Sequence, residues 1–114
     1  MSDETWATLV RHEGEAPREQ STCGWRDRLI SREDDGRVAA WAHAVDIDGA
    51  REHYHRRSAE LYYVLDGEGT FLLNGQELSM RSGDLLMAPS GVPHGVKNTG
   101  PQRLLVLAVL APAP

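Results

Sequence analysis

Short turn signals recur along this chain and leave room for strands rather than long helices. They are Asp35-Gly36, Asp66-Gly67-Glu68-Gly69, Asn74-Gly75, Ser82-Gly83-Asp84 and Thr99-Gly100-Pro101. Glycine reaches the positive φ that tight turns need, and Asn-Gly is a strong hairpin signal. Between these turns no helical period persists over about ten residues. The pattern predicts an all-β fold of many short strands, built as a sandwich or a barrel.

The apolar segments between the turns give the expected strands. These are 25–31, 37–47, 52–56, 60–66, 70–73, 76–80, 84–88, 93–98 and 103–110. Residues Asp3 to Arg11 are the one place for a short helix, and the polar stretch from Glu13 to Ser21 is expected to be a loose arm. We therefore divide the chain into two parts. The N-terminal arm over 1–22 is a candidate dimer contact, and residues 23–114 form one β-domain.

Charge and apolar content narrow the choice of partner. The formal net charge of −5 repels a phosphate backbone and argues against nucleic-acid binding. No stretch reaches the ~20 apolar residues of a membrane span. Cys23 is the one cysteine, so the fold does not depend on a disulfide, and no secretory signal is seen at the start. These features predict a cytoplasmic protein.

Two histidines, a glutamate and a third histidine form the constellation that carries chemistry. Residues two apart on a strand point the same way, so His53 and His55 project to one side. A polar turn leads to Glu60, which a hairpin would place on the adjacent strand. His94 is the best fourth ligand, because the prolines around it fix its backbone.

Three imidazoles and one carboxylate suit a borderline divalent metal: Fe, Mn, Ni, Cu, Co or Zn. Four protein ligands leave one or two positions open for substrate or oxygen on a five- or six-coordinate ion. The alternative is that each histidine is an ordinary surface or core residue. The joint spacing of His53, His55, Glu60 and His94 favours the metal site.

These residues also resemble the two motifs of the cupin superfamily. In the first motif His53, His55, Glu60 and Gly67 match, whereas Gly49 stands closer to the histidines than the family pattern has its glycine. Every position of the second motif matches: Gly83, Pro89, Gly91, His94 and Asn98. The resemblance implies a cupin jelly-roll β-barrel of two antiparallel sheets, with one divalent transition metal inside it on these four ligands. It also implies a homodimer and a small-molecule substrate.

Other polar side chains share faces with the expected core. His43 lies on the face of Trp41 and Val45, where it is either a cavity-lining acid or base or a core histidine bonded to a backbone carbonyl. Tyr62 shares the face of Glu60, with cavity lining and plain packing both open. Arg26 and Arg28 share one face of a strand, where they either bind a carboxylate substrate or form a solvated edge.

Three functions follow in order of preference. The first is a metal-dependent oxidoreductase of dioxygenase type, with His43 and Tyr62 as candidate catalytic residues. The second is a non-redox isomerase, lyase, cyclase or decarboxylase in which the metal polarises a carbonyl. The third is a barrel that binds or senses a small molecule without turnover.

Overall fold

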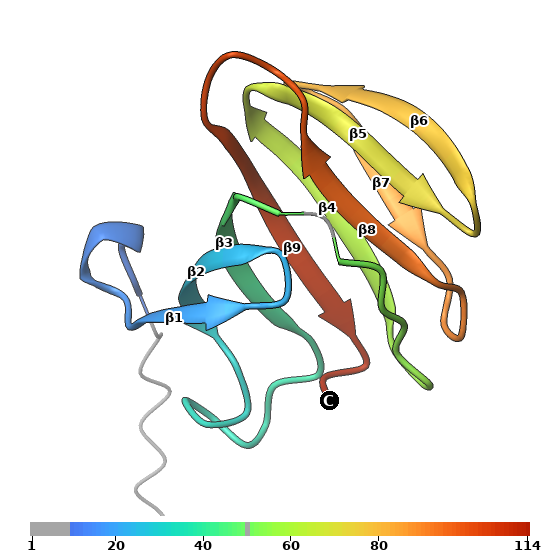
Figure 1. Cartoon of the computed structure of the whole chain (residues 1–114). Helices are drawn as coiled ribbons and strands as arrows, with labels where there is room; N and C mark the ends of the chain where they lie inside the picture. Colours follow the sequence, from blue (N-terminus) through green and yellow to red (C-terminus); the bar gives the residue numbers. More distant parts are fainter. Residues whose placement is uncertain (1–9, 50) are drawn as a thin grey trace, which may run out of the picture.

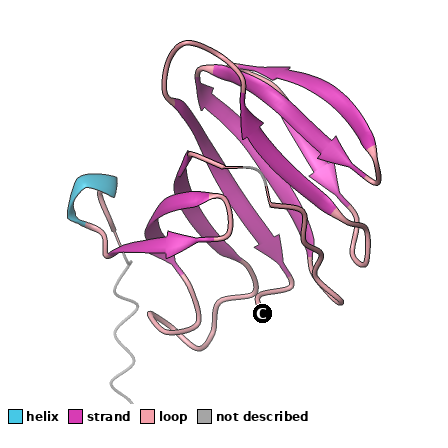
Figure 2. Cartoon of the chain, in the orientation of Figure 1, coloured by secondary structure: helices cyan, strands magenta, loops and turns pink. Residues whose placement is uncertain are grey.

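The computed structural model describes residues 10–49 and 51–114. Within that part, one 3-10 turn, η1, is followed by nine strands (Figure 1). Their bounds are η1 Glu13–Glu15, β1 Arg18–Ser21, β2 Gly24–Ile30, β3 Trp41–Ile47, β4 Ala59–Asp66, β5 Glu68–Leu73, β6 Gln76–Arg81, β7 Leu85–Ala88, β8 His94–Asn98 and β9 Leu104–Ala111. The expected all-β fold is confirmed, and strands dominate the chain in Figure 2. No helix in the described part is long and apolar enough to cross a membrane.

The strands form two antiparallel sheets. The larger has the order β1-β2-β3-β9-β4-β7 and the smaller has the order β6-β5-β8. Strand β9 pairs with β3 on one side and β4 on the other, so segments far apart in sequence lie side by side. This is the two-sheet architecture that the jelly-roll expectation required.

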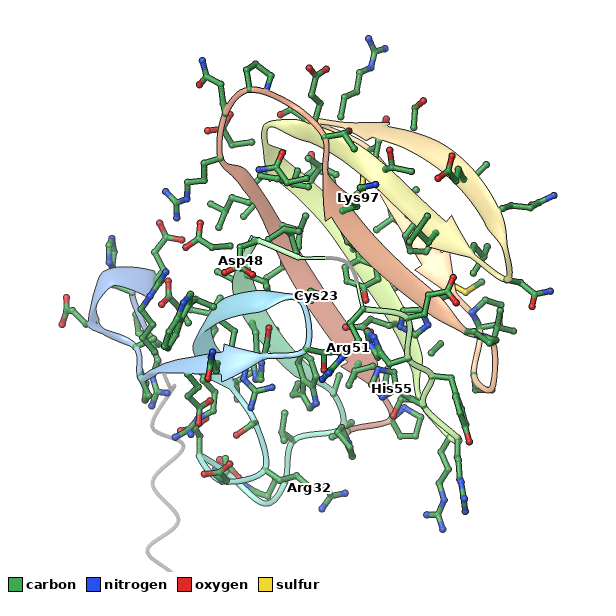
Figure 3. All side chains as sticks on the ribbon, viewed as in Figure 1. Cys23, Arg32, Asp48, Arg51, His55 and Lys97 are labelled. Carbon is green, nitrogen blue, oxygen red and sulfur yellow. The ribbon has the colours of Figure 1, made fainter. Side chains whose placement is uncertain are left out.

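The core lies between the sheets and is set by alternation along the strands. In β9, Leu104, Val106, Ala108 and Leu110 are buried, while the intervening residues are partly exposed. Side chains from the smaller sheet meet them, since Phe71 and Val96 are also fully buried. Figure 3 draws the side chains of both sheets on the ribbon. The apolar alternation therefore explains why the two sheets close on each other.

Two tight turns agree with their sequence signals. Asn74 and Gly75 both have positive φ, as a two-residue hairpin between β5 and β6 requires. Gly67 also has positive φ, and a Cβ there would lie 2.2 Å from the carbonyl oxygen of Arg103. Only glycine fits at that position without displacing backbone.

The N-terminal expectation was partly wrong. Residues 1–9 lie outside the described residues, and with them most of the expected helix at Asp3 to Arg11. The expected loose arm instead contains β1, which pairs along its length with β2. Ion pairs hold it there, because Arg18 bonds Asp27 and Asp46, and Glu19 bonds arginines of β2. A polar strand fixed by charge leaves no hydrophobic period to detect.

Two further strand expectations need correction. Residues 52–56 do not form a strand; His53 makes only an isolated antiparallel bridge with His94 of β8. Glu60 is therefore not hairpin-paired with the His53 segment, and it lies on β4 between β7 and β9. Strand β3 begins at Trp41 rather than at residue 37, because Asp35 binds Arg37 in a local turn.

Candidate metal centre

Four side chains from three separate segments meet in the barrel interior. Glu60 comes from β4, His94 opens β8, and His53 and His55 come from the connection before β4. Their candidate ligand atoms all lie within 4.8 Å of one another. Glu60 Oε1 is 2.9 Å from His94 Nε2, 3.1 Å from His55 Nε2 and 3.6 Å from His53 Nε2. The structure thus brings together the four residues that the sequence spacing singled out.

Backbone contacts fix the connection that carries two of these histidines. His53 and His94 exchange both backbone hydrogen bonds, at 2.9 and 2.8 Å. The Gly91 N–H donates to the His55 carbonyl oxygen at 2.7 Å. These bonds attach residues 53–55 to the smaller sheet. The imidazoles of His53 and His55 therefore point toward the Glu60 carboxylate of the larger sheet.

The hydrogen bonds of the rings determine which nitrogen faces the centre. His53 Nδ1 lies 3.1 Å from the Arg51 carbonyl oxygen, and His94 Nδ1 lies 2.9 Å from the Val92 carbonyl oxygen. A carbonyl oxygen only accepts, so each Nδ1 donates and each neutral ring keeps its lone pair on Nε2. These lone pairs face Glu60 Oε1, which is also an acceptor. Acceptors that converge in this way need a cation or a proton between them.

The donor set fits a bound metal ion. Two ligands each ~2.1 Å from one ion are separated by ~3.0–3.4 Å at ordinary coordination angles. The separations from Glu60 Oε1 lie close to that range. Carbonyl groups that orient the second nitrogen of a ligating histidine are typical of metal sites. The residues His53, His55, Glu60 and His94 are therefore arranged as a possible metal site, as predicted.

Charge and burial shift the pKa values of Glu60 and His53. Burial raises the pKa of Glu60, but in the metal-free chain His53, His55 and His94, which donate to the carboxylate when Nε2 carries a proton, outweigh it and hold the net pKa far below its usual range. The carboxylate therefore stays ionised. The hydrogen bond to Glu60 in turn raises the pKa of His53 despite burial. His94 and Glu60 are almost fully buried, whereas His53 and His55 are partly exposed toward the cavity.

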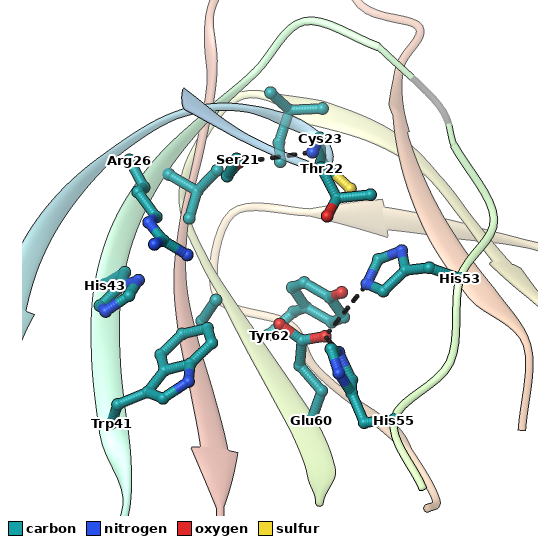
Figure 4. A pocket seen from close by; sticks show the side chains of 13 residues that line it. Ser21, Thr22, Cys23, Arg26, Trp41, His43, His53, His55, Glu60 and Tyr62 are labelled. Atoms are coloured by element: carbon teal, nitrogen blue, oxygen red, sulfur yellow. Dashed lines mark hydrogen bonds and ion pairs between the residues drawn. The ribbon is translucent and has the colours of Figure 1, made fainter. Parts of the chain in front are cut away.

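A cavity of about 80 Å³ opens beside the centre (Figure 4). It is lined by three of the candidate ligands, by the turn between β1 and β2, and by side chains of the surrounding strands, β3 among them. The lining residues are Ser21, Thr22, Cys23, Arg26, Trp41, His43, Val45, Ile47, His53, His55, Glu60, Tyr62 and Ala108. A molecule in this cavity would contact the centre and residues that are not ligands.

Tyr62 both lines the cavity and packs in the core. Its ring meets Phe71 and His94 edge-on, with centroid separations of 5.6 and 6.0 Å. Burial raises the pKa of Tyr62, and the negative charge of Glu60 raises it further. The phenol therefore remains protonated and can act only as a neutral donor or acceptor.

His43 lines the cavity without the backbone partner that the core interpretation required. It is 2% exposed, and among the described residues neither ring nitrogen has a hydrogen-bond partner. Its ring stacks on Trp41 with centroids 3.9 Å apart. Burial lowers the pKa of His43 to about 4, and the charge of Arg26 adds to that shift. The imidazole is therefore neutral at ordinary pH.

Sequence reasoning missed part of the cavity wall. Ser21, Thr22 and Cys23 were not expected there, because they lie at the turn between β1 and β2. Burial raises the pKa of the Cys23 thiol. Of the two arginines on β2, Arg26 lines this cavity but Arg28 does not. The sequence pattern did not reveal strand β1, so the pairing of β1 with β2 that positions this turn and these arginines could not be predicted.

Two curated proteins match part of this sequence. The oxalate-binding protein of Thermotoga maritima is 41% identical over 58 residues, which are 51% of this chain and 48% of that protein. The quercetin 2,3-dioxygenase of Bacillus subtilis is 35% identical over 46 residues, 40% of this chain and 14% of the enzyme. The matched stretch thus spans about half of the first relative and a small part of the second.

A solved structure matches nearly the whole described fold. The crystal structure of a predicted oxalate decarboxylase from Thermotoga maritima superposes with a TM-score of 0.78. It is 27% identical and covers 90% of this chain and 98% of that one. The family model described as "Cupin domain" matches residues 45–110, which include all four candidate ligands. The chain therefore belongs to the cupin family.

Proposed function

We propose that this cupin is a metal-dependent enzyme that acts on a small organic molecule in the barrel, as an oxidoreductase of dioxygenase type. The observation that carries the proposal is the shared cavity. His53, His55 and Glu60 line it together with Arg26, His43 and Tyr62, which are not ligands. A purely structural metal site is closed by its ligands, whereas a catalytic site faces space for a substrate.

His53, His55, Glu60 and His94 would hold the ion. A bound divalent transition ion would supply Lewis acidity and, for a redox-active metal, electron transfer. The chain's own residues do the rest. The Arg51 and Val92 carbonyl groups orient two imidazoles, and the ionised Glu60 balances part of the positive charge. The apolar wall formed by Val45, Ile47 and Ala108 limits water in the cavity.

Two cavity residues are our candidates for proton handling. Tyr62 keeps its phenol proton, and its burial beside Glu60 places that proton near the centre. His43 is neutral, so it offers one N–H and one lone pair to a substrate. Both roles are proposals that rest on position in the cavity and on protonation state.

Oxygen consumption tests the proposal. Chain loaded with iron or manganese should consume oxygen with at least one member of a panel of small enols, phenols, diketones and carboxylates. Glu60→Ala should abolish uptake, while Glu77→Ala on the exposed face of β6 should retain it. The absence of uptake across the panel, with metal bound in full, would overturn the dioxygenase assignment.

The size of the cavity favours a second candidate, a non-redox reaction on a small carbonyl or carboxylate compound. About 80 Å³ is small beside the ~300–1,000 Å³ of pockets for drug-sized ligands. A polycyclic substrate such as that named for the dioxygenase relative fits such a space poorly, whereas the ligand named for the Thermotoga maritima relative is small. Turnover with zinc or nickel under nitrogen would support this candidate over the first. Binding without turnover under either condition would leave a sensing barrel.

A further inference from the structure

The cavity has two chemically different walls (Figure 4). One carries the candidate metal ligands and Tyr62. The other is formed by β2 and β3 and presents Arg26, Trp41 and His43. The metal chemistry needs only the first wall. The polar groups of the second wall therefore need an explanation of their own.

His43 is the clearest anomaly on the second wall. At 2% exposure, both ring nitrogens lack a hydrogen-bond partner in the described part of the chain. Buried polar groups in native proteins are almost always bonded, and an exception calls for a cause. The ring is held by stacking on Trp41, so it cannot easily turn toward solvent. Because the same ring borders the cavity, a ligand in the cavity can supply the missing partner.

Arg26 offers the matching charge. Its Nε donates to Glu19 at 3.3 Å, but within residues 10–49 and 51–114 its terminal nitrogens have no hydrogen-bond partner. Arg28, two positions on, instead bonds Glu19, Glu33 and Asp34. The guanidinium of Arg26 lies 6.0 Å from the Trp41 ring centroid and extends toward the cavity in Figure 4. Arg26 thus combines a permanent charge with donors available to a ligand.

We propose that Arg26 and His43 form an anion subsite that binds the carboxylate of a small substrate across the cavity from the His/Glu centre. A guanidinium fork matches the planar carboxylate, and the His43 N–H adds a third donor. Trp41 stacks on His43 and lies within cation–π range of the Arg26 guanidinium, 6.0 Å away. The inference rests on the proposed function, because it names the substrate class for that site.

The size and chemistry of the cavity restrict the anion. A volume of about 80 Å³ accepts only a few heavy atoms, which excludes large acids from lying wholly inside it. An adjoining pocket of about 340 Å³ shares Arg26, Trp41, His43 and His55, but it does not include Glu60 or His53. The reacting part of the substrate must therefore fit in the smaller space.

Calorimetry with two isosteric probes tests the subsite. Zinc-loaded protein should bind oxalate at least tenfold more tightly than oxamide, which has the same shape but no charge. Arg26→Gln should weaken oxalate binding at least tenfold, and Arg26→Lys should fall between. His43→Phe, which keeps the stacking surface, should also weaken it. Arg37→Gln is the matched control, because Arg37 is exposed, paired with Asp35 and outside the cavity.

Zinc content, measured for every variant, separates this inference from the proposed function. If zinc loads fully and Arg26→Gln binds oxalate as tightly as Arg37→Gln, the subsite is overturned while the metal site stands. If zinc loads in no variant, the metal proposal fails, yet oxalate binding by the metal-free chain that falls in Arg26→Gln still supports the subsite. Equal affinity for oxamide and oxalate would overturn the anion assignment.

Discussion

Glu60 Oε1 lies 2.9 Å from His94 Nε2, although the two residues are 34 positions apart and belong to opposite sheets. Their contact joins β4 of the larger sheet to β8 of the smaller one. An ion held by both would therefore link the sheets as well as provide chemistry. A ligand that binds only the folded state stabilises that state by about 2.7 kcal/mol when its free concentration is a hundred times its dissociation constant.

Removal of His94 should abolish metal binding. The variant His94→Ala should lower affinity for zinc or manganese by more than about 100-fold, because it removes a buried ligand that the Val92 carbonyl orients. Elemental analysis after dialysis measures the stoichiometry. His12→Ala is the control, since His12 caps η1 far from the centre in sequence. Added metal should raise the melting temperature of wild type and of the control but not of His94→Ala.

Replacing His43 with Phe should weaken ligand binding and raise the stability of the fold. The variant His43→Phe removes two buried nitrogens that have no partner in the described chain, so unfolding free energy at pH 7 should rise by about 1–3 kcal/mol. Urea denaturation of the metal-free protein measures the change. A loss of stability would show that the imidazole is a structural element, contrary to the cavity-lining role.

The stability of the wild-type protein should fall in mild acid because of the same residue. The pKa of folded His43 is about 4, below the ~6.5 of an unfolded chain. Between these values the unfolded state binds the proton and the folded state does not, so lower pH favours unfolding. From pH 7 to pH 5 the stability of wild type relative to His43→Phe should drop by about 2 kcal/mol. An identical pH profile for both proteins would contradict the assignment.

Asp34 should be the most sensitive acidic residue in the loop after β2. It accepts bonds from Arg11, from Arg28 and from the backbone N–H of Ser31, and its side chain is only 7% exposed. Asp34→Asn should cost about 1–3 kcal/mol of unfolding free energy. Glu33→Gln is the matched control, because the 72% exposed Glu33 side chain makes one ion pair and should change stability by less than ~0.5 kcal/mol. Thermal unfolding of the two variants compares them directly.

Most of the barrel was predictable because its strands carry strong local signals. The alternation from Leu104 to Leu110 and the Asn74-Gly75 hairpin both appear where the pattern puts them. Strand β1 was missed because Arg18 and Glu19 are held by ion pairs to partners that are distant in sequence or on the next strand. No periodicity of hydrophobic residues records such contacts.

The candidate ligands were predictable for a different reason. Their residue types and spacing are specific, so His53, His55, Glu60 and His94 were identified even though His53 lies on an isolated bridge and not on a strand. The route by which they meet was wrong, since Glu60 faces the histidines across the barrel. The β2–β3 wall of the cavity could be predicted only in part from the sequence. The proposed role of Arg26 depends on its terminal nitrogens having no partner among the described residues, and only the structure gives those contacts.

The division of the cavity into a ligand wall and a β2–β3 wall has an evolutionary consequence. If Arg26 and His43 bind substrate as proposed, substitutions at Arg26, Trp41 or His43 would alter which compound is accepted while the four candidate ligands stay intact. Duplicated copies of such a barrel would then diverge toward new specificities in single steps while they keep the four candidate ligands. An inherited centre with a replaceable facing wall is one physical route by which a small fold comes to serve many different reactions.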